Sequence, residues 1–122
     1  MPRDRITRLR ELCLALPEAH EVEAWGTPTF RVRNKIFAMY ASDLHGDGRV
    51  AVWCKATPAD QDLLVHAFPE RFFVPPYVGP RGWLGVRLDR SVRWTMVRDL
   101  VTEAYRMTAP KRLLARLDGD GA

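Results

Sequence analysis

The stretch TFRVRNKIFAMY, residues 29–40, decides the fold. Its first five residues alternate between apolar and polar side chains, which is the pattern of a half-buried strand. Asn34-Lys35 then predicts a tight hairpin turn, because asparagine tolerates a positive φ. The apolar residues 36–40 supply the partner strand. We therefore expect an antiparallel β-hairpin in the first half of the chain.

The rest of the chain supplies elements on either side of this hairpin. Helical spacing of apolar residues, with prolines that begin or end the segments, predicts the helices, and short alternating runs predict the strands. We expect helices at residues 6–16, 58–67 and 94–105, a last helical turn at 113–117, and strands at 29–33, 36–40, 49–54, 71–74 and 83–88. The order α-β3-α-β2-α predicts an α+β fold. It is a two-layer sandwich, in which an antiparallel five-stranded sheet has its helices packed on one face.

Three acidic residues, Glu18, Glu21 and Glu23, lie between the first helix and the hairpin. If this segment is extended, Glu21 and Glu23 share a face, and paired carboxylates can do acid–base work. Proximity in sequence fixes no geometry, however, and we interpret the segment as a solvated acidic loop.

The composition is that of one globular domain. The chain has 122 residues, of which 47% are hydrophobic and 28% charged, and this excludes disordered and collagen-like proteins. We expect a single domain over residues 1–122, with its core at about 6–117 and a flexible tail at 118–122. No apolar run approaches the roughly 18 residues of a membrane span, and residues 1–6 lack the apolar region of a signal peptide. The sequence therefore predicts a cytoplasmic protein without a membrane partner.

The residue types that carry catalysis are sparse. Cys13 and Cys54 belong to no CxxC pair, and Cys13 lies on the apolar face of the first helix. His20, His45 and His66 share no metal-ligand spacing, and neither serine lies in a GxSxG motif. We therefore expect no metal, no cofactor and no enzymatic activity.

Aromatic residues stand beside turn residues at three places. An aromatic ring held by a rigid turn can stack on a base or another planar ligand. The three rings, with the cations that lie in the same motifs, are Trp25, Tyr77 and Trp83 with Lys35, Arg81 and Lys111. In one interpretation these segments converge on a single aromatic cleft with a basic rim. In the other, the rings are buried at the end of the sandwich as part of its core, and the neighbouring glycines only provide the backbone angles that the turns require.

Basic side chains provide candidate contacts for an anion. The chain has 19 Lys and Arg against 15 Asp and Glu, a formal net charge of +4. Arg31 and Arg33 alternate with the apolar residues of the hairpin, and Lys111 and Arg112 lie in a basic stretch near the C-terminus. Such residues can contact a phosphate backbone, which gives affinity without base identity. The alternative is an uncovered sheet face that is basic only for solubility.

Several motifs together resemble a known family. They are LPEA (16–19), WGTPTFRV (25–32), KIFA (35–38), PERFFVPPYVGPRGW (69–83), EAY (103–105) and APKRL (109–113). With these motifs the chain resembles the MmcQ/YjbR family over about residues 6–117. The resemblance implies a fold like that of the type III secretion chaperones, α-β3-α-β2-α in two layers. It also implies DNA binding, the label that members commonly carry, but it transfers no catalytic residues.

Two functional hypotheses follow, and a third is weaker. The first is a small non-enzymatic protein that contacts DNA phosphates through Lys35, Arg81 and Lys111, independently of sequence because no known recognition helix is evident. The second is a chaperone-like protein-interaction module that binds a peptide or a second copy of the chain. The third, an enzyme acting on a small anionic substrate, lacks a nucleophile, a metal site or a cofactor motif. The sequence leaves the oligomeric state open.

Overall fold

A single antiparallel sheet forms the frame of the protein. The computed structural model describes residues 4–43 and 48–119, and the sheet has the order β1-β2-β3-β4-β6-β5. The strands are β1 (His20–Ala24), β2 (Thr27–Val32), β3 (Lys35–Ser42), β4 (Val50–Cys54), β5 (Phe72–Phe73) and β6 (Leu84–Arg87). The helices are α1 (Arg5–Leu14), α2 (Pro58–Ala67), α3 (Trp94–Arg106) and α4 (Lys111–Leu117), and a short 3-10 helix, η2, covers Gly79–Arg81. The α+β class is thus confirmed, as an open sheet with four helices.

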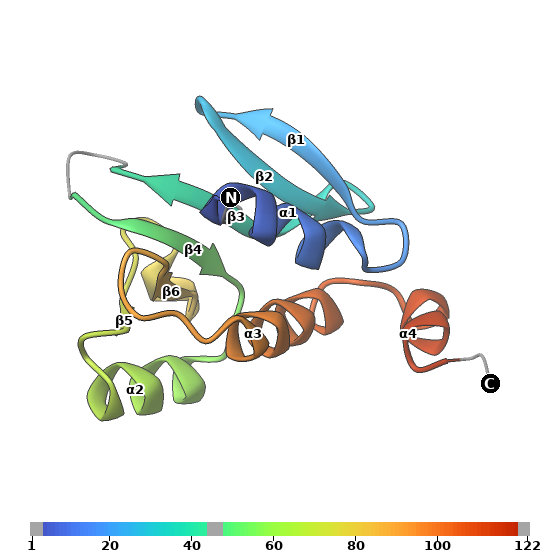
Figure 1. Ribbon diagram of the computed structural model, residues 1–122. Helices are drawn as coiled ribbons and strands as arrows, with labels where there is room; N and C mark the ends of the chain where they lie inside the picture. The colour runs from blue at the N-terminus through green and yellow to red at the C-terminus, as the bar shows by residue number, and fades with distance from the viewer. Residues whose placement is uncertain (1–3, 44–47, 120–122) are drawn as a thin grey trace.

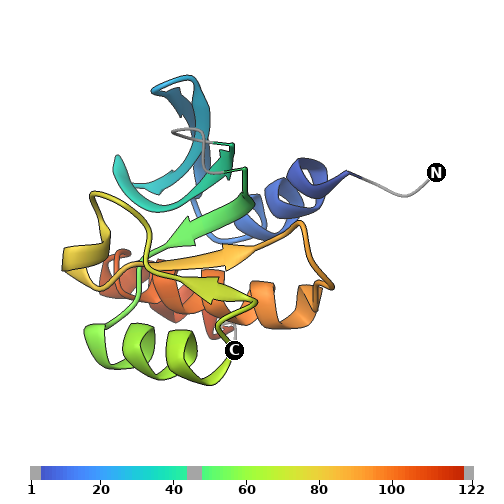
Figure 2. The ribbon, with the colours of Figure 1, turned by 90° about the vertical axis from the view of Figure 1, so that its left-hand side faces the viewer.

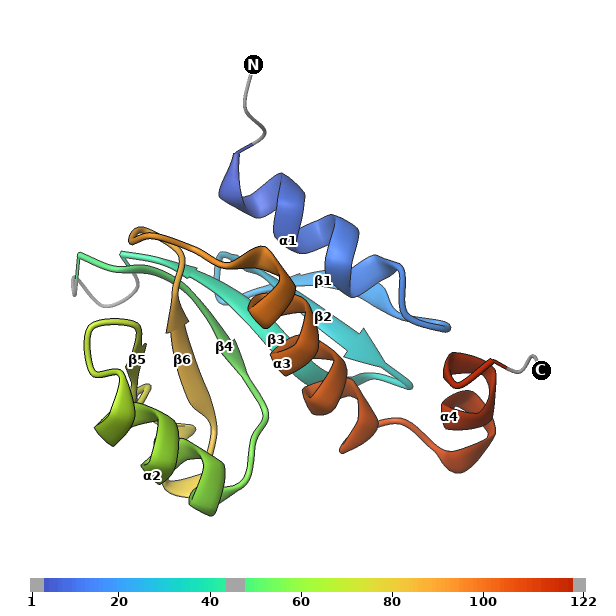
Figure 3. The ribbon, with the colours of Figure 1, turned by 60° about the horizontal axis from the view of Figure 1, so that its bottom comes forward.

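The helices leave one face of the sheet uncovered. α1 and α3 lie across the other face (Figures 1 and 3), where they contact β3. α2 lies beside β5, and α4 lies beyond the tip of the β2–β3 hairpin (Figure 3). On the uncovered side, the β1–β2 hairpin and η2 stand on either side of β3 and β4 (Figure 2). No helix in the described part of the chain is long and apolar enough to cross a membrane.

The main core lies between the sheet and the helices. Phe30, Phe37 and Tyr105 are among its largest fully buried side chains. The Phe37 and Tyr105 rings meet edge to face with centroids 5.5 Å apart, and the Tyr105 hydroxyl donates a hydrogen bond to the Pro17 carbonyl at 2.7 Å. This bond satisfies the polar end of a buried aromatic side chain and ties the segment that follows α1 to α3.

A β-bulge at Phe37 decides which side chains reach the uncovered face. Phe30 pairs with Ala38 and Arg31 with Ile36, so Phe37 has no residue opposite it. The extra residue lets Phe37 and Ala38 both join the core beneath the helices. Ile36 and Arg31 therefore lie together on the other face of the sheet.

The sheet has six strands, and the five-stranded prediction is wrong. The segment that we interpreted as an acidic loop is β1, which pairs along its whole length with β2. The Glu21 carboxylate is held by the Arg10 guanidinium at 2.9 and 3.0 Å, so pairing with β2 and with α1 orders a segment that looks solvated in sequence. The hairpin turn is also displaced by one residue: Val32 pairs with Lys35, and the turn is Arg33-Asn34.

Candidate binding cleft

A second apolar cluster lies on the uncovered face of the sheet. Strand alternation produces it: Val52 and Cys54 join the core beneath the helices, whereas Ala51 and Trp53 face the other way. The cluster consists of Met39, Ala41, Ala51, Trp53, Phe73 and Trp83. It forms an apolar floor on the face that α1 and α3 leave uncovered.

The segment after β5 folds back as a wall beside this floor. The Gln61 amide of α2 donates hydrogen bonds to the carbonyls of Gly79 and Trp83, at 2.9 and 2.7 Å. Gly82 has φ +91°, and a Cβ there would lie 2.8 Å from Pro58. Only glycine therefore permits this close approach of η2 to α2, which positions the residues on either side of it.

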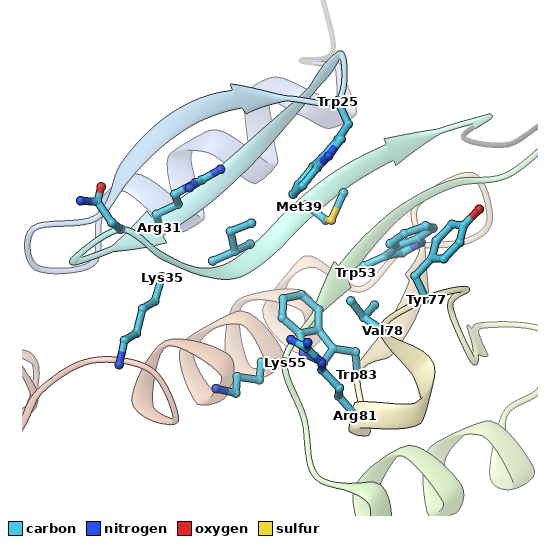
Figure 4. Close-up of a pocket in the computed structure, with 12 residues that line it drawn as sticks. Trp25, Arg31, Lys35, Met39, Trp53, Lys55, Tyr77, Val78, Arg81 and Trp83 are labelled. Atoms are coloured by element: carbon cyan, nitrogen blue, oxygen red, sulfur yellow. The ribbon is translucent and has the colours of Figure 1, made fainter.

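Floor and walls enclose a cleft of about 990 Å³ (Figure 4). Four aromatic residues, three aliphatic or thioether side chains, one amide and four cations line it. They are Trp25, Trp53, Tyr77 and Trp83; Ile36, Met39 and Val78; Asn34; and Arg31, Lys35, Lys55 and Arg81. We call this site the aromatic cleft. Its volume lies within the usual range of small-molecule sites.

Two aromatic residues stand exposed on opposite sides of the aromatic cleft (Figure 4). Trp25 is 73% exposed and comes from the β1–β2 turn; Tyr77 is 75% exposed and comes from the wall near η2. Both have left-handed backbones, with φ +54° and +65°. A bulky residue is uncommon in this conformation, and such strain concentrates at ligand-binding sites.

All four charged residues that line the aromatic cleft are cations. Arg31 is held in place by a hydrogen bond from its Nε to the Thr29 hydroxyl at 3.1 Å. Lys35 comes from the start of β3, Lys55 follows β4, and Arg81 ends η2. Within residues 4–43 and 48–119, no Asp, Glu, His, Ser or Cys lines the aromatic cleft. The site therefore has a positive potential and lacks the residue types most often used for acid–base or nucleophilic chemistry.

The floor of the aromatic cleft contains an unpartnered donor. Trp53 is 2% exposed, and its indole Nε1–H has no hydrogen-bond partner within the described residues. Buried donors are normally paired, so each exception requires an explanation.

The structure brings together most, but not all, of the residues that the sequence singled out. Trp25, Tyr77, Trp83, Arg31, Lys35 and Arg81 line the aromatic cleft. Lys111 is exposed at the start of α4 and does not line it. Arg33 and Arg112 bind the Glu18 carboxylate instead, at 3.2 and 3.7 Å. The positive φ of Arg33 turns the chain at the hairpin tip, so Arg33 does not continue the alternation that we expected.

Sequence reasoning missed Trp53 and Lys55. The alternation of residues 49–54 contained the signal for Trp53, because it places that residue on the face opposite Val52. Lys55 had no such signal, because it lies beyond the strand.

The cysteines are poor nucleophiles. Burial raises the pKa of the Cys54 thiol to about 12 and also raises that of the Cys13 thiol. Both thiols therefore stay protonated at neutral pH. In the described ranges, no group of three or more His, Cys, Asp or Glu side chains is placed to hold a metal ion; His45 lies outside these ranges.

Comparisons with known proteins agree on the family. The search among curated proteins gave no match. Among solved structures, the chain is similar to Deinococcus radiodurans protein DR2400, with its family-model domain DUF419. The TM-score is 0.72 at 22% identity, over 88% of this chain and 80% of that one. This match shows a shared fold. The family model YjbR matches residues 14–107, which confirms the resemblance carried by the motifs: the chain belongs to the YjbR (MmcQ/YjbR) family.

Proposed function

We propose that the protein binds single-stranded DNA, with unpaired bases stacked in the aromatic cleft and phosphates paired with its cations. One observation carries the proposal: two exposed aromatic residues with left-handed backbones border a cleft whose charged residues are all cations. Stacking is sequence-tolerant, because every base has a π-face. The binding is therefore largely independent of sequence.

The shape of the site favours unpaired over paired DNA. In a duplex the bases are stacked on one another, and a protein reaches only their edges through the grooves. The aromatic cleft instead places the exposed rings of Trp25 and Tyr77 at the border of an apolar floor, which suits an unstacked base. The cations Arg31, Lys35, Lys55 and Arg81 surround this floor and suit the phosphates that accompany such a base.

The same residues support binding without chemistry. Among the described residues, the lining offers stacking surfaces and charge, but none of the carboxylate, imidazole, serine or threonine hydroxyl, or thiol groups on which most hydrolytic mechanisms depend. We therefore propose a non-enzymatic binding protein.

A fluorescence anisotropy titration tests this proposal. Labelled single-stranded DNA and the duplex of the same sequence are titrated at about 50 and 200 mM salt, a range over which phosphate contacts weaken steeply. We expect saturable binding that is tighter for the single strand and weakens with salt. Equal or tighter binding of the duplex contradicts the proposal, as does the absence of binding at the lower salt.

A pair of variants locates the site. Lys35→Gln/Arg81→Gln removes two charges from the aromatic cleft, and we expect it to weaken binding at both salt concentrations. Arg90→Gln/Arg98→Gln is the matched control, because it removes two exposed charges outside the cleft. If both pairs weaken binding equally, the aromatic cleft is not the site.

A second candidate function rests on a different surface. A hollow of about 240 Å³ lies between α2, β5 and α3, lined mainly by apolar side chains such as Leu64, Phe68 and Leu100. Phe68 and the neighbouring Leu63 are 46% and 65% exposed. Exposed apolar surface of this kind suits a peptide or a second copy of the chain. This function becomes the leading candidate if single-stranded DNA does not bind.

A further inference from the structure

One carboxylate is shared by three arginines beside the aromatic cleft. Glu18 accepts contacts from Arg33 Nε at 3.2 Å, Arg116 Nη1 at 3.1 Å and Arg112 Nη2 at 3.7 Å. Among the described residues, Glu18 is the one carboxylate that these three guanidinium groups meet within ion-pair distance. We call the four residues the Glu18 cluster. One negative charge against three positive charges leaves it strongly cationic.

Two elements fix the positions of these arginines. Arg112 and Arg116 are four residues apart on α4 and so share one helix face. Arg33 occupies the β2–β3 turn with φ +52°, and α4 lies beside this turn (Figure 3). The cluster is thus formed by segments far apart in the sequence.

The guanidinium groups retain free donors toward solvent. The side chains of Arg33, Arg112 and Arg116 are 47%, 64% and 55% exposed. A guanidinium carries five N–H donors in a planar fork that matches the oxygens of a phosphate. The single shared carboxylate occupies only a few of these donors, so the cluster can accept a further anion.

The Glu18 cluster adjoins the aromatic cleft at the β2–β3 turn. Arg33 is followed directly by Asn34 and Lys35, and both of these line the cleft. A strand that leaves the cleft past Lys35 therefore meets Arg33 first and the two arginines of α4 next.

We infer that the Glu18 cluster is a second phosphate site, which holds the backbone of a DNA strand after it leaves the aromatic cleft. The inference rests on the proposed function and extends it: the cleft binds bases, and the cluster binds phosphodiesters further along the same strand. The cluster therefore determines how strongly the affinity for DNA depends on the length of the strand and on the salt concentration.

Two single-stranded oligonucleotides separate the two sites. Their lengths, about 4 and about 12 nucleotides, span most of the range of known single-strand sites. For the unmodified protein we expect the longer strand to bind more tightly, with a steeper decline of log K against log salt. Each phosphate contact on a single strand contributes about 0.7 to that slope.

The Arg112→Gln/Arg116→Gln variant tests the cluster. For the longer strand we expect the slope to decrease by about 1.4, which is two contacts at about 0.7 each, and most of the length-dependent affinity to disappear. Binding of the short strand stays unchanged, which also shows that the variant is folded. Arg112→Lys/Arg116→Lys keeps both charges and retains most of the slope, and Arg90→Gln/Arg98→Gln is the control for general loss of charge.

The outcomes distinguish the two proposals. If neither oligonucleotide binds the unmodified protein, the proposed function fails and the cluster loses its role with it. If the short strand binds but length brings no gain, or if Arg112→Gln/Arg116→Gln leaves the slope for the longer strand intact, the inference about the Glu18 cluster is wrong while the cleft stands.

Discussion

Trp25 and Tyr77 are in backbone conformations that their residue type disfavours. Both have a positive φ and are about three-quarters exposed, so neither is stabilised by deep burial. For residues other than glycine, a left-handed backbone costs roughly 1–2 kcal/mol. Both line the aromatic cleft, so the proposed stacking on a base gives a reason for this cost.

Replacing Trp25 separates stability from binding. Trp25-Gly26 is a two-residue hairpin turn with positive φ at both positions, a turn in which Asn-Gly is the favoured pair. We expect Trp25→Asn to raise the free energy of unfolding by about 1 kcal/mol. We also expect it to weaken DNA binding by the 1–3 kcal/mol that is typical of one stacked base.

Urea denaturation and anisotropy titration of the same samples measure both effects. Pro28→Ala, close to the turn but outside the lining of the aromatic cleft, is the control for local changes in the hairpin. Unchanged affinity in Trp25→Asn contradicts the role of the ring.

Asp89 makes stability depend on pH. The Arg87 guanidinium, at 3.0 Å, lowers the pKa of this carboxyl from 3.8 to about 2. A pKa lower in the folded than in the unfolded state stabilises the protein above pH 3.8, and this contribution is lost as the pH falls toward 2. Since both side chains are 18% exposed, we expect a loss of about 1–2 kcal/mol across this window.

Thermal unfolding at a series of pH values measures this loss. Asp89→Asn removes the titrating group, so its stability declines less steeply between about pH 4 and pH 2. Asp99→Asn is the control, because the Asp99 side chain is 70% exposed. Equal pH dependence in Asp89→Asn and the unmodified protein rules out this role for Asp89.

At the scale of elements, α2 positions one wall of the aromatic cleft without lining it. Gln61 bonds the carbonyls at both ends of the η2 segment, and Gly82 brings that segment against Pro58. The wall that carries Tyr77 and Arg81 is therefore anchored to α2, although most of α2 is exposed.

Gln61→Leu removes this anchor and leaves the lining residues in place. Losing two hydrogen bonds to buried carbonyls destabilises the protein by about 1–3 kcal/mol, and we expect DNA affinity to fall as well because the wall loosens. Asp62→Asn, the exposed neighbour, serves as control. Reduced stability with unchanged affinity shows that Gln61 supports the fold alone and does not position the cleft.

The elements also show what the sequence could and could not predict. Residues 29–33 alternate and residues 36–40 are apolar, so the hairpin was predicted correctly to within one residue of its turn. β1 escaped prediction because its glutamates are typical of solvated loops. Pairing with β2 across the Trp25-Gly26 turn and the ion pair with Arg10 order it, and strand formation depends on such neighbours as much as on the segment itself. Prolines begin α2 and precede α4 as the sequence indicated.

The site was predictable only in part for the same reason. Trp25, Tyr77 and Trp83 were found because each aromatic residue stands beside turn residues, although only Trp25 and Tyr77 are exposed. Lys35 lines the cleft, whereas Arg33 binds Glu18. The backbone φ angles of the turn decide which of these two side chains points toward the cleft. A sequence pattern of alternating residues does not encode that rotation.

At the scale of the whole molecule, the two faces of the sheet have different roles. The face beneath α1 and α3 holds the main core, whereas the uncovered face carries the aromatic cleft. The formal net charge of +4 is modest, but within the cleft and the Glu18 cluster the described charges are almost all positive. We therefore expect the local field, rather than the net charge, to steer the proposed DNA to these sites.

The four tryptophans provide a direct test of whether DNA occupies the aromatic cleft. Trp25, Trp53 and Trp83 line the aromatic cleft. Trp94 begins α3 and packs against the main core with the Arg8 guanidinium 4.8 Å above its ring, so it is an internal control. Each tryptophan gives one indole N–H signal in a nitrogen–proton NMR spectrum, and single Trp→Phe variants assign them.

The decisive measurement is a titration of the labelled protein with single-stranded DNA, followed through these four signals. We expect the signals of Trp25, Trp53 and Trp83 to shift together and to saturate, while that of Trp94 stays in place. A shift at Trp94 with the other three unmoved, or no shift at any of the four under conditions in which anisotropy reports binding, would show that DNA does not occupy the aromatic cleft.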